Sequence, residues 1–184
     1  MWGKFLKTLF VVIFACIKCS IVFGQIPISA QNFISNQNVY KQIDSLIYDG
    51  KTTAVIDTFN VSIVPPQFSM KVDNRTFISP ATTSSVQISE IKRVVYLMAV
   101  KNINEEILAP QGVHLVSKED VVTTNNKEGI LVIVQMKVDT IDFYRMMLFT
   151  GDYMRTIWVT ANYPVALKDK MEAILRKTLL SIKF

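Results

Sequence analysis

The single histidine of the chain, His114, is the first residue to consider for chemistry, because Glu119 and Asp120 follow it closely in "VHLVSKED". An imidazole beside carboxylates could ligate a metal ion or act as a general base. A metal site usually needs three or four converging ligands, however, and only one histidine is available. We therefore predict no metal centre here and retain His114 as a candidate binding residue near a loop.

Other catalytic arrangements find little support. A serine triad would have to recruit His114, and no serine lies in a G-x-S-x-G turn. No glycine belongs to a dinucleotide fingerprint or a phosphate-binding loop. A hydrolase that uses two carboxylates stays open as an alternative, because acids distant in sequence can meet in a fold. The sequence thus predicts a protein that is not an enzyme and has no cofactor.

The first 24 residues have the layout of a secretory signal peptide. Lys4 and Lys7 precede an uninterrupted apolar run, Leu9–Ile17, and small or apolar residues end the segment. We predict a signal peptide over residues 1–24, cleavage before Gln25, and export to the periplasm or the extracellular space. Two alternatives are a retained N-terminal membrane anchor and a lipid anchor at Cys16, since "IFAC" loosely resembles a lipobox.

Cleavage would change the composition. Residues 1–24 hold three lysines and both cysteines, so 160 residues would remain with 17 basic and 15 acidic side chains. No basic stripe with interleaved aromatic residues remains to indicate nucleic-acid binding. We divide the remainder into a leader with a short helix, residues 25–52, and one domain, residues 53–184.

Periodicity predicts the elements of that domain. Alternating apolar and polar residues predict strands, and apolar residues at helical spacing predict helices. The expected strands cover 59–63, 77–78, 84–91, 130–138, 141–149 and 153–163, and a strand followed by a turn is expected within 113–122. The expected helices cover 36–49, 94–108 and 166–181. Short reversals at Asp139-Thr140 and Gly151-Asp152 would make the last three strands an antiparallel meander.

The last strand is apolar on both sides. Ile157, Val159 and Ala161 line one face, whereas Met154 and Trp158 occupy the other. A sheet with one wet face alternates cleanly between apolar and polar residues, so both faces here need cover. We predict an α/β/α sandwich of the α+β type, with a mainly antiparallel sheet covered by helices on both faces.

Aromatic and methionine side chains are frequent around the meander. Most should belong to the core, but such residues also dominate partner-binding patches and small-molecule pockets. If the cover over the Trp158 face is incomplete, Tyr144 and Trp158 would mark a candidate binding surface, with His114 as a second candidate position.

The order of these elements, with the short words "SIVPPQF", "FTGDY", "ANYP" and "LLSIKF", resembles the PsbP-like fold shared with the Mog-type Ran-binding proteins and with small exported bacterial proteins. The resemblance covers about residues 59–184. It implies a non-catalytic accessory or adaptor protein, although the ion- and partner-binding residues of the photosystem member have no match here. We therefore expect a bacterial binding domain of the cell envelope with a protein partner. The alternatives are a carrier of a small apolar ligand and the carboxylate hydrolase.

Overall fold

The structure is a computed structural model that describes residue 48 and residues 50–184. The expected signal peptide, the cleavage site before Gln25 and Cys16 lie outside the described residues. So does the leader helix expected over 36–49, apart from Tyr48.

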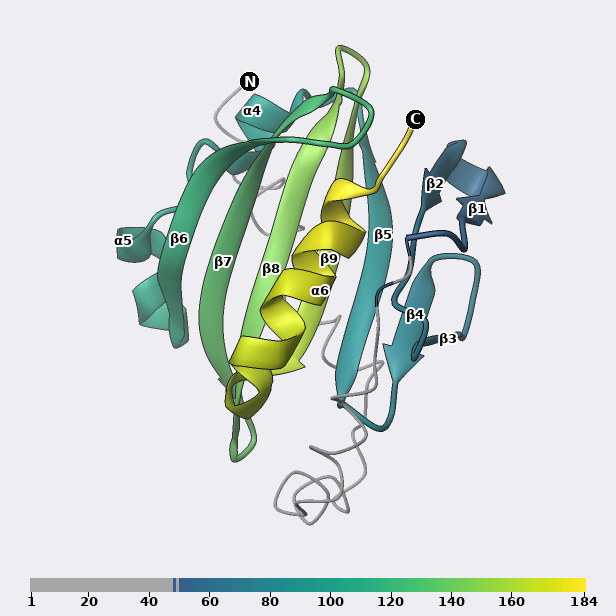
Figure 1. Ribbon diagram of the computed structural model, residues 1–184. Helices are drawn as coiled ribbons and strands as arrows, with labels where there is room; N and C mark the ends of the chain where they lie inside the picture. Colours follow the sequence, from purple (N-terminus) through teal and green to yellow (C-terminus); the bar gives the residue numbers. More distant parts are fainter. Residues whose placement is uncertain (1–47, 49) are drawn as a thin grey trace.

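An antiparallel sheet of seven strands organises the domain (Figure 1). Its spatial order is β3 (Met70–Lys71), β4 (Thr76–Ser79), β5 (Ser84–Lys92), β9 (Arg155–Pro164), β8 (Ile141–Asp152), β7 (Glu128–Val138) and β6 (Val113–Val122). The predicted hairpin of β4 and β5 and the predicted meander of β7, β8 and β9 are confirmed as antiparallel neighbours.

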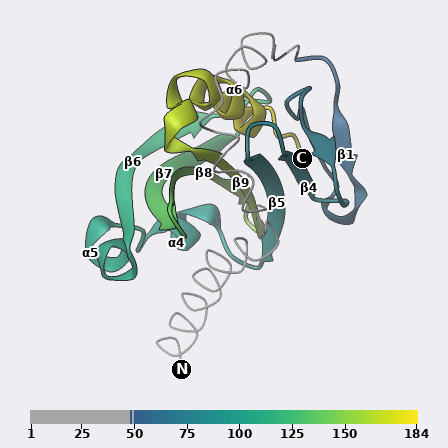
Figure 2. The same cartoon turned by 90° about the horizontal axis from the view of Figure 1, so that it is seen from below.

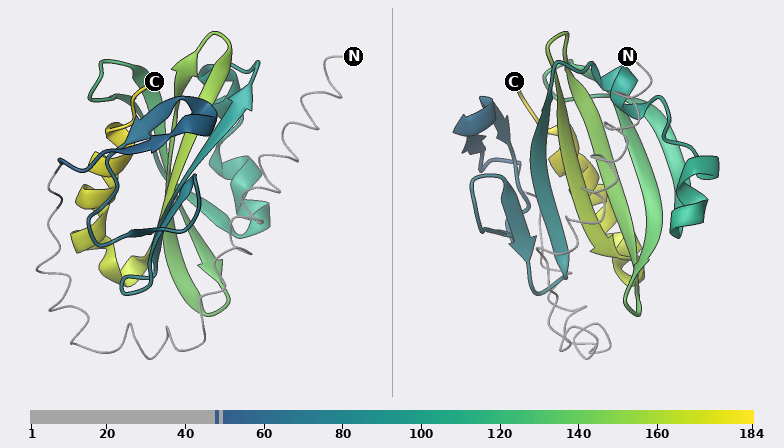
Figure 3. Two further views of the ribbon diagram at one scale, coloured as in Figure 1. Left: turned by 90° about the vertical axis from the view of Figure 1, so that its right-hand side faces the viewer. Right: turned by 180° about the vertical axis from the view of Figure 1, so that it is seen from behind.

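A smaller two-stranded sheet precedes this one. It pairs β1 (Ala54–Ile56) with β2 (Val61–Ile63), and the 3₁₀ helix η1 (Asp57–Phe59) connects them. The strand predicted over 59–63 therefore starts too early, because Asn60 adopts a left-handed conformation at the end of η1. Ser62 bridges to Lys183, which fixes the small sheet beside the C-terminus (Figure 3).

The turn between β8 and β9 lies two residues later than predicted. Gly151 and Asp152 still belong to β8, opposite Thr156 and Arg155, and Tyr153 and Met154 form the turn. Gly151 has φ +151°, and a Cβ there would stand 2.2 Å from the carbonyl oxygen of Arg155. Glycine at this position thus permits a close approach of the two strands rather than the reversal itself.

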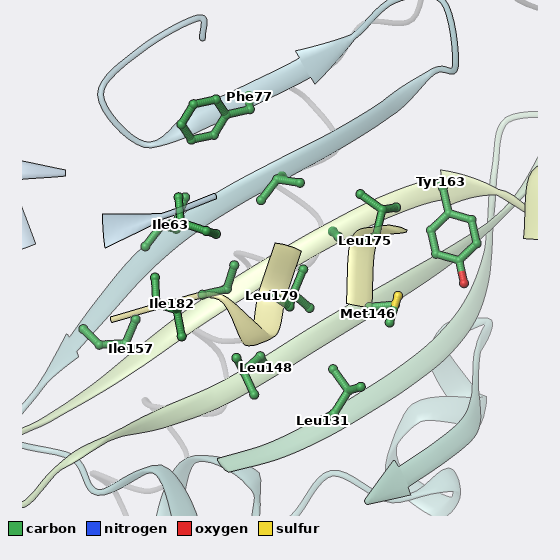
Figure 4. Packing of buried hydrophobic residues seen from close by; sticks show 14 of the residues in the cluster. Ile63, Phe77, Leu131, Met146, Leu148, Ile157, Tyr163, Leu175, Leu179 and Ile182 are labelled. Atoms are coloured by element: carbon green, nitrogen blue, oxygen red, sulfur yellow. The ribbon is translucent and has the colours of Figure 1, made fainter. Parts of the chain in front are cut away.

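One face of the sheet, here called the α6 face, packs against the C-terminal helix. The 3₁₀ helix η3 (Val165–Leu167) leads into α6 (Lys168–Leu180), close to the span predicted for a helix. Met171, Leu175 and Leu179 are fully buried, and they belong to one cluster with sheet residues such as Leu148. Figure 4 shows this cluster at close range.

On the opposite face, here called the α4 face, the single helix predicted over 94–108 is wrong. Two short helices replace it, α4 (Tyr96–Val100) and α5 (Glu105–Leu108), followed by the 3₁₀ helix η2 (Ala109–Gln111). Asn104 interrupts the helix with extended backbone angles and accepts a hydrogen bond from the Ile107 N–H. An N-cap of this kind starts a new helix instead of continuing the old one.

The two short helices occupy different places. Helix α4 contacts β7, β8 and β9, whereas α5 lies against β6. Figure 2 shows α6 and α4 on opposite sides of the sheet. The fold class is α+β, with a mostly antiparallel sheet. Within the part of the chain that the structure describes, no helix is long and apolar enough to span a membrane.

Candidate functional site

Tyr144 and Trp158, predicted to share a surface, lie on opposite faces of the sheet. The register sets Tyr144 opposite Tyr163 and Phe149 opposite Trp158. Tyr144 is half-buried on the α6 face, with its ring centroid 5.7 Å from that of Tyr163 and 5.3 Å from Nζ of Lys168. Side chains alternate between faces along a strand, so Tyr144 and Phe149, five residues apart, point in opposite directions.

Trp158 belongs to the core of the α4 face. Its side chain stacks on Phe149 with ring centroids 5.6 Å apart and an interplanar angle of 11°, and only 5% of the residue is exposed. The indole Nε1–H is buried and has no hydrogen-bond partner. A buried donor without an acceptor costs free energy. Packing of the ring explains why Trp158 is buried, but it does not explain why its Nε1–H has no acceptor.

His114 lies on the solvent side of β6, where it meets α5. Its Nδ1 is 3.0 Å from Oε1 of Glu105, and Oε2 of the same carboxylate accepts the Leu115 N–H at 2.5 Å. These two contacts, the backbone N–H first, lower the pKa of Glu105. The arrangement fastens α5 to the start of β6.

The acids that neighbour His114 in sequence do not converge on it. Glu119 points to the α6 face, where it receives two hydrogen bonds from Arg176, at 2.7 Å and 2.9 Å. Arg176 thereby lowers the pKa of Glu119. Asp120 lies near Tyr96, on the other face, where burial first, and then Glu128 and Asp120, raise the pKa of that phenol. Among residues 48 and 50–184, no group of three or more His, Cys, Asp or Glu side chains could hold a metal ion.

Sequence reasoning missed the most exposed apolar residues of the domain. Tyr153 and Met154, in the turn between β8 and β9, are 91% and 68% exposed, and Leu97 and Met98 of α4 are also largely exposed. The Arg93 N–H donates to the Met154 carbonyl at 2.6 Å, which joins the turn to the segment that enters α4. We call these four residues the hairpin-end surface. It lies at the end of the sheet opposite the β7–β8 turn (Figure 1).

Local hydrogen bonds explain the exposure of Tyr153 and Met154. The Asp152 carboxylate accepts the N–H groups of Met154 and Arg155, at 2.8 Å and 3.1 Å, and so shapes the turn. Met154 therefore lies outside the strand, and the prediction that it shares a strand face with Trp158 is wrong. The signal was present in the sequence: an aspartate at the start of a turn commonly caps backbone N–H groups two or three residues ahead.

Basic residues adjoin the two parts of the hairpin-end surface: Lys92 lies opposite Arg155, Arg93 bonds to Met154, and Lys101 follows α4. Lys92, Arg93 and Lys101 are exposed, whereas the nearby Glu90 side chain is only 9% exposed and pairs with Arg155 at 3.1 Å. Asp152 is held by its turn and by Arg155, 3.5 Å away. The local charge offered to a partner is therefore positive.

The fold is that of the Mog and PsbP proteins. The structure is similar to that of the Ran-binding protein Mog1p of Saccharomyces cerevisiae, with a TM-score of 0.52 and 9% sequence identity over 72% of this chain and 94% of Mog1p. It is equally similar to the cyanobacterial PsbP (CyanoP) of Synechocystis sp. PCC 6803, with a TM-score of 0.52 and 13% identity over 72% of this chain and 91% of that protein.

These likenesses confirm the PsbP/Mog-like fold that the sequence indicated. Identities of 9% and 13% support the fold alone. The sequence itself matches no protein-family model and no curated protein sequence.

Proposed function

We propose that the chain is a non-catalytic, exported accessory domain of the cell envelope that binds a protein partner through the hairpin-end surface. This proposal rests on the exposure of Tyr153 and Met154 in the turn, and of Leu97 and Met98 on α4, whose entering segment bonds to that turn through Arg93. A single exposed apolar residue needs no explanation, but a group of four at one end of the sheet does.

The chemistry of this surface suits a protein partner. Tyrosine, methionine and arginine are enriched in protein interfaces, and a few such residues supply most of the binding energy. The exposed Lys92, Arg93 and Lys101 would favour a partner whose contact region is apolar at its centre and acidic at its rim. Mog1p, a Ran-binding protein, shows that this fold supports protein recognition in one case, although a shared fold does not transfer the partner.

The remaining parts of the proposal concern the sheet and the N-terminus. We take both faces to be covered, by α6 on one side and by α4 and α5 on the other. A partner would therefore bind at an end of the sheet. The pattern of residues 1–24 supports export.

Photocrosslinking in cells tests the proposed surface. A photoreactive phenylalanine at position 153 should yield a discrete adduct with another protein. The same residue at Lys137, exposed beside the β7–β8 turn, is the matched control and should yield none. Met154→Asp should abolish the adduct formed from position 153. Equal adduct patterns from positions 153 and 137 would contradict the proposed surface.

Fractionation of the same cells tests export. The chain should appear in the envelope or extracellular fraction as a form that begins at Gln25. Retention of an unprocessed chain inside the cell would contradict the exported role while leaving the surface hypothesis to the crosslinking result.

One observation favours the second candidate, a carrier of a small apolar ligand. The unpartnered Nε1–H of Trp158 lies among apolar side chains, where a ligand carbonyl could accept it. In a Trp2→Phe background, Trp158 is the only indole, so its fluorescence reports the site. A carrier should respond to 2-decanone and not to n-decane, which lacks the acceptor. An unchanged spectrum with both would reject this function.

A further inference from the structure

The strand β6 forms one edge of the seven-stranded sheet, and no strand of the described residues pairs with its outer side. Long open edges tend to pair with other strands, and proteins commonly protect them with bulges or covering segments. The first part of β6 is protected in this way. A bulge lies between Leu115 and Ser117, α5 contacts the strand, and Glu105 accepts the Leu115 N–H. The part beyond the bulge has no such protection from Glu105.

The ladder shows which backbone groups of this second part point outward. Alternate residues of a strand direct their N–H and C=O groups to the same neighbour. The Thr123 N–H bonds to the Lys127 carbonyl, toward β7. By this alternation, the backbone N–H and C=O groups of Val121 and Glu119 also point to β7. The backbone groups of Lys118, Asp120 and Val122 therefore point outward, at the open edge.

We propose that this edge pairs with the same edge of a second copy of the chain, antiparallel about a two-fold axis at Glu119. In that register Lys118 of one copy lies opposite Asp120 of the other, twice over. Both residues direct their backbone groups outward, so the pair can exchange two hydrogen bonds.

The side chains fit this register. Lys118 Nζ donates to the carbonyls of Val100 and Ile103, at 2.8 Å and 3.3 Å. An ammonium group has three donors, so one is left for Asp120 of the second copy. The Asp120 side chain is exposed and lies near the Tyr96 phenol, as does Glu128. Pairing would give Asp120 a cationic partner, Lys118 of the second copy.

The residue on the two-fold axis does not oppose pairing. Two Glu119 carboxylates would face each other there, and like charges directly opposite are unfavourable. Each, however, carries its own Arg176 through two hydrogen bonds. Two carboxylates and two guanidinium groups would thus lie near the axis, and their charges would cancel. A closed two-fold contact of this kind is the commonest form of homo-oligomer.

Charge reversal with recombination tests the register. The chain is expressed from the full 184-residue sequence, so that any processing occurs, and its mass in solution is followed by sedimentation over a concentration series. Asp120→Lys and Lys118→Glu each place like charges opposite each other in a homodimer. The wild-type chain should dimerise, and each variant alone should dissociate with a Kd raised roughly tenfold or more.

An equimolar mixture of the two variants restores opposite charges at both positions and should dimerise again. Asp57→Lys, the same charge change at an exposed site on η1, serves as the control and should leave the Kd unchanged. Circular dichroism of each variant checks the fold, because Lys118 also supports the loop after α4. A monomeric wild-type chain, or variants that dimerise as well alone as when mixed, would overturn the proposal. Neither result bears on the hairpin-end surface.

Discussion

On the α6 face, a 13-residue helix supplies Met171, Leu175 and Leu179 to the core, and all three are completely buried. On the α4 face, the largest helix that contacts the centre of the sheet has five residues and supplies only Ala99 and Val100 as buried side chains. The sheet itself fills much of that face with large side chains, above all the stacked Phe149 and Trp158. On the α4 face, large side chains of the strands thus fill the space that helix side chains fill on the α6 face.

The two faces also fasten their helices to the edge strand β6 in different ways. On the α6 face, Arg176 of the helix binds the strand side chain of Glu119. At α5, Glu105 of the helix binds the strand backbone at Leu115. An ion pair needs both partners charged, whereas a carboxylate bound to an N–H needs only its own charge.

Removing the aromatic bulk of the α4 face should have the largest effect. We expect Trp158→Ala to lower the free energy of unfolding by about 3–5 kcal/mol, because α4, with five residues, is too short to fill the space left by the buried indole. Urea denaturation measures the change. A Trp158→Ala chain with wild-type stability and lost partner binding would instead show that Trp158 acts at a surface.

The matching change on the α6 face is Leu175→Ala. We expect a loss of about 2–5 kcal/mol in the same assay, with the long helix free to settle partly into the cavity. Leu97→Ala, at a largely exposed position of α4, is the control and should change stability by no more than about 0.5 kcal/mol. If Leu175→Ala costs far more than Trp158→Ala, the contrast between the faces is wrong.

Buried polar atoms without a partner occur on both sides of the sheet, and removing such an atom should stabilise the protein. Thr178 Oγ1 on α6 is such an atom, as is Nε1 of Trp158. Thr178→Val keeps the shape and removes the hydroxyl, so we expect a gain of about 1 kcal/mol in thermal or urea unfolding. Thr178→Ser retains the hydroxyl and should show no gain. A destabilised Thr178→Val chain would mean that the hydroxyl has a partner in solution.

The sequence predicted one face better than the other for a physical reason. Helix α6 is visible because Met171, Leu175 and Leu179 recur on one side over three turns. The segment 94–108 shows the same spacing, yet Asn104 caps a new helix and divides it, and a single capping residue leaves the apolar periodicity unchanged. Pattern alone could not separate the two outcomes.

The candidate site was harder to predict than the fold. Tyr153 and Met154 read as part of a continuous apolar strand, and their exposure depends on hydrogen bonds of Asp152 that a pattern of apolar residues does not contain. The contact of His114 with Glu105 joins residues from a helix and a strand, so it requires the tertiary structure.

The smallest effect concerns the two carboxylates that fasten the helices to β6. Arg176 lowers the pKa of Glu119, so the folded state favours the charged form. Such a group stabilises the protein fully above its unfolded pKa, about 4.3, and the contribution is lost as the pH falls through the lower folded value. Because the side chain is 41% exposed, we expect Glu119→Gln to cost at most about 1 kcal/mol at neutral pH. The difference from wild type should shrink below about pH 4.

Glu105→Gln should follow the same direction with pH, because the Leu115 N–H lowers the pKa of Glu105. Added salt should change the stability effects of the two substitutions to different extents. Added salt screens an exposed ion pair, so it should reduce the effect of Glu119→Gln more than that of Glu105→Gln, whose main contact is to an uncharged backbone group. Unfolding curves of both variants at low and high salt measure this. An equal salt response would show that both helices are held to β6 by the same kind of interaction, and the contrast between the two attachments would fail.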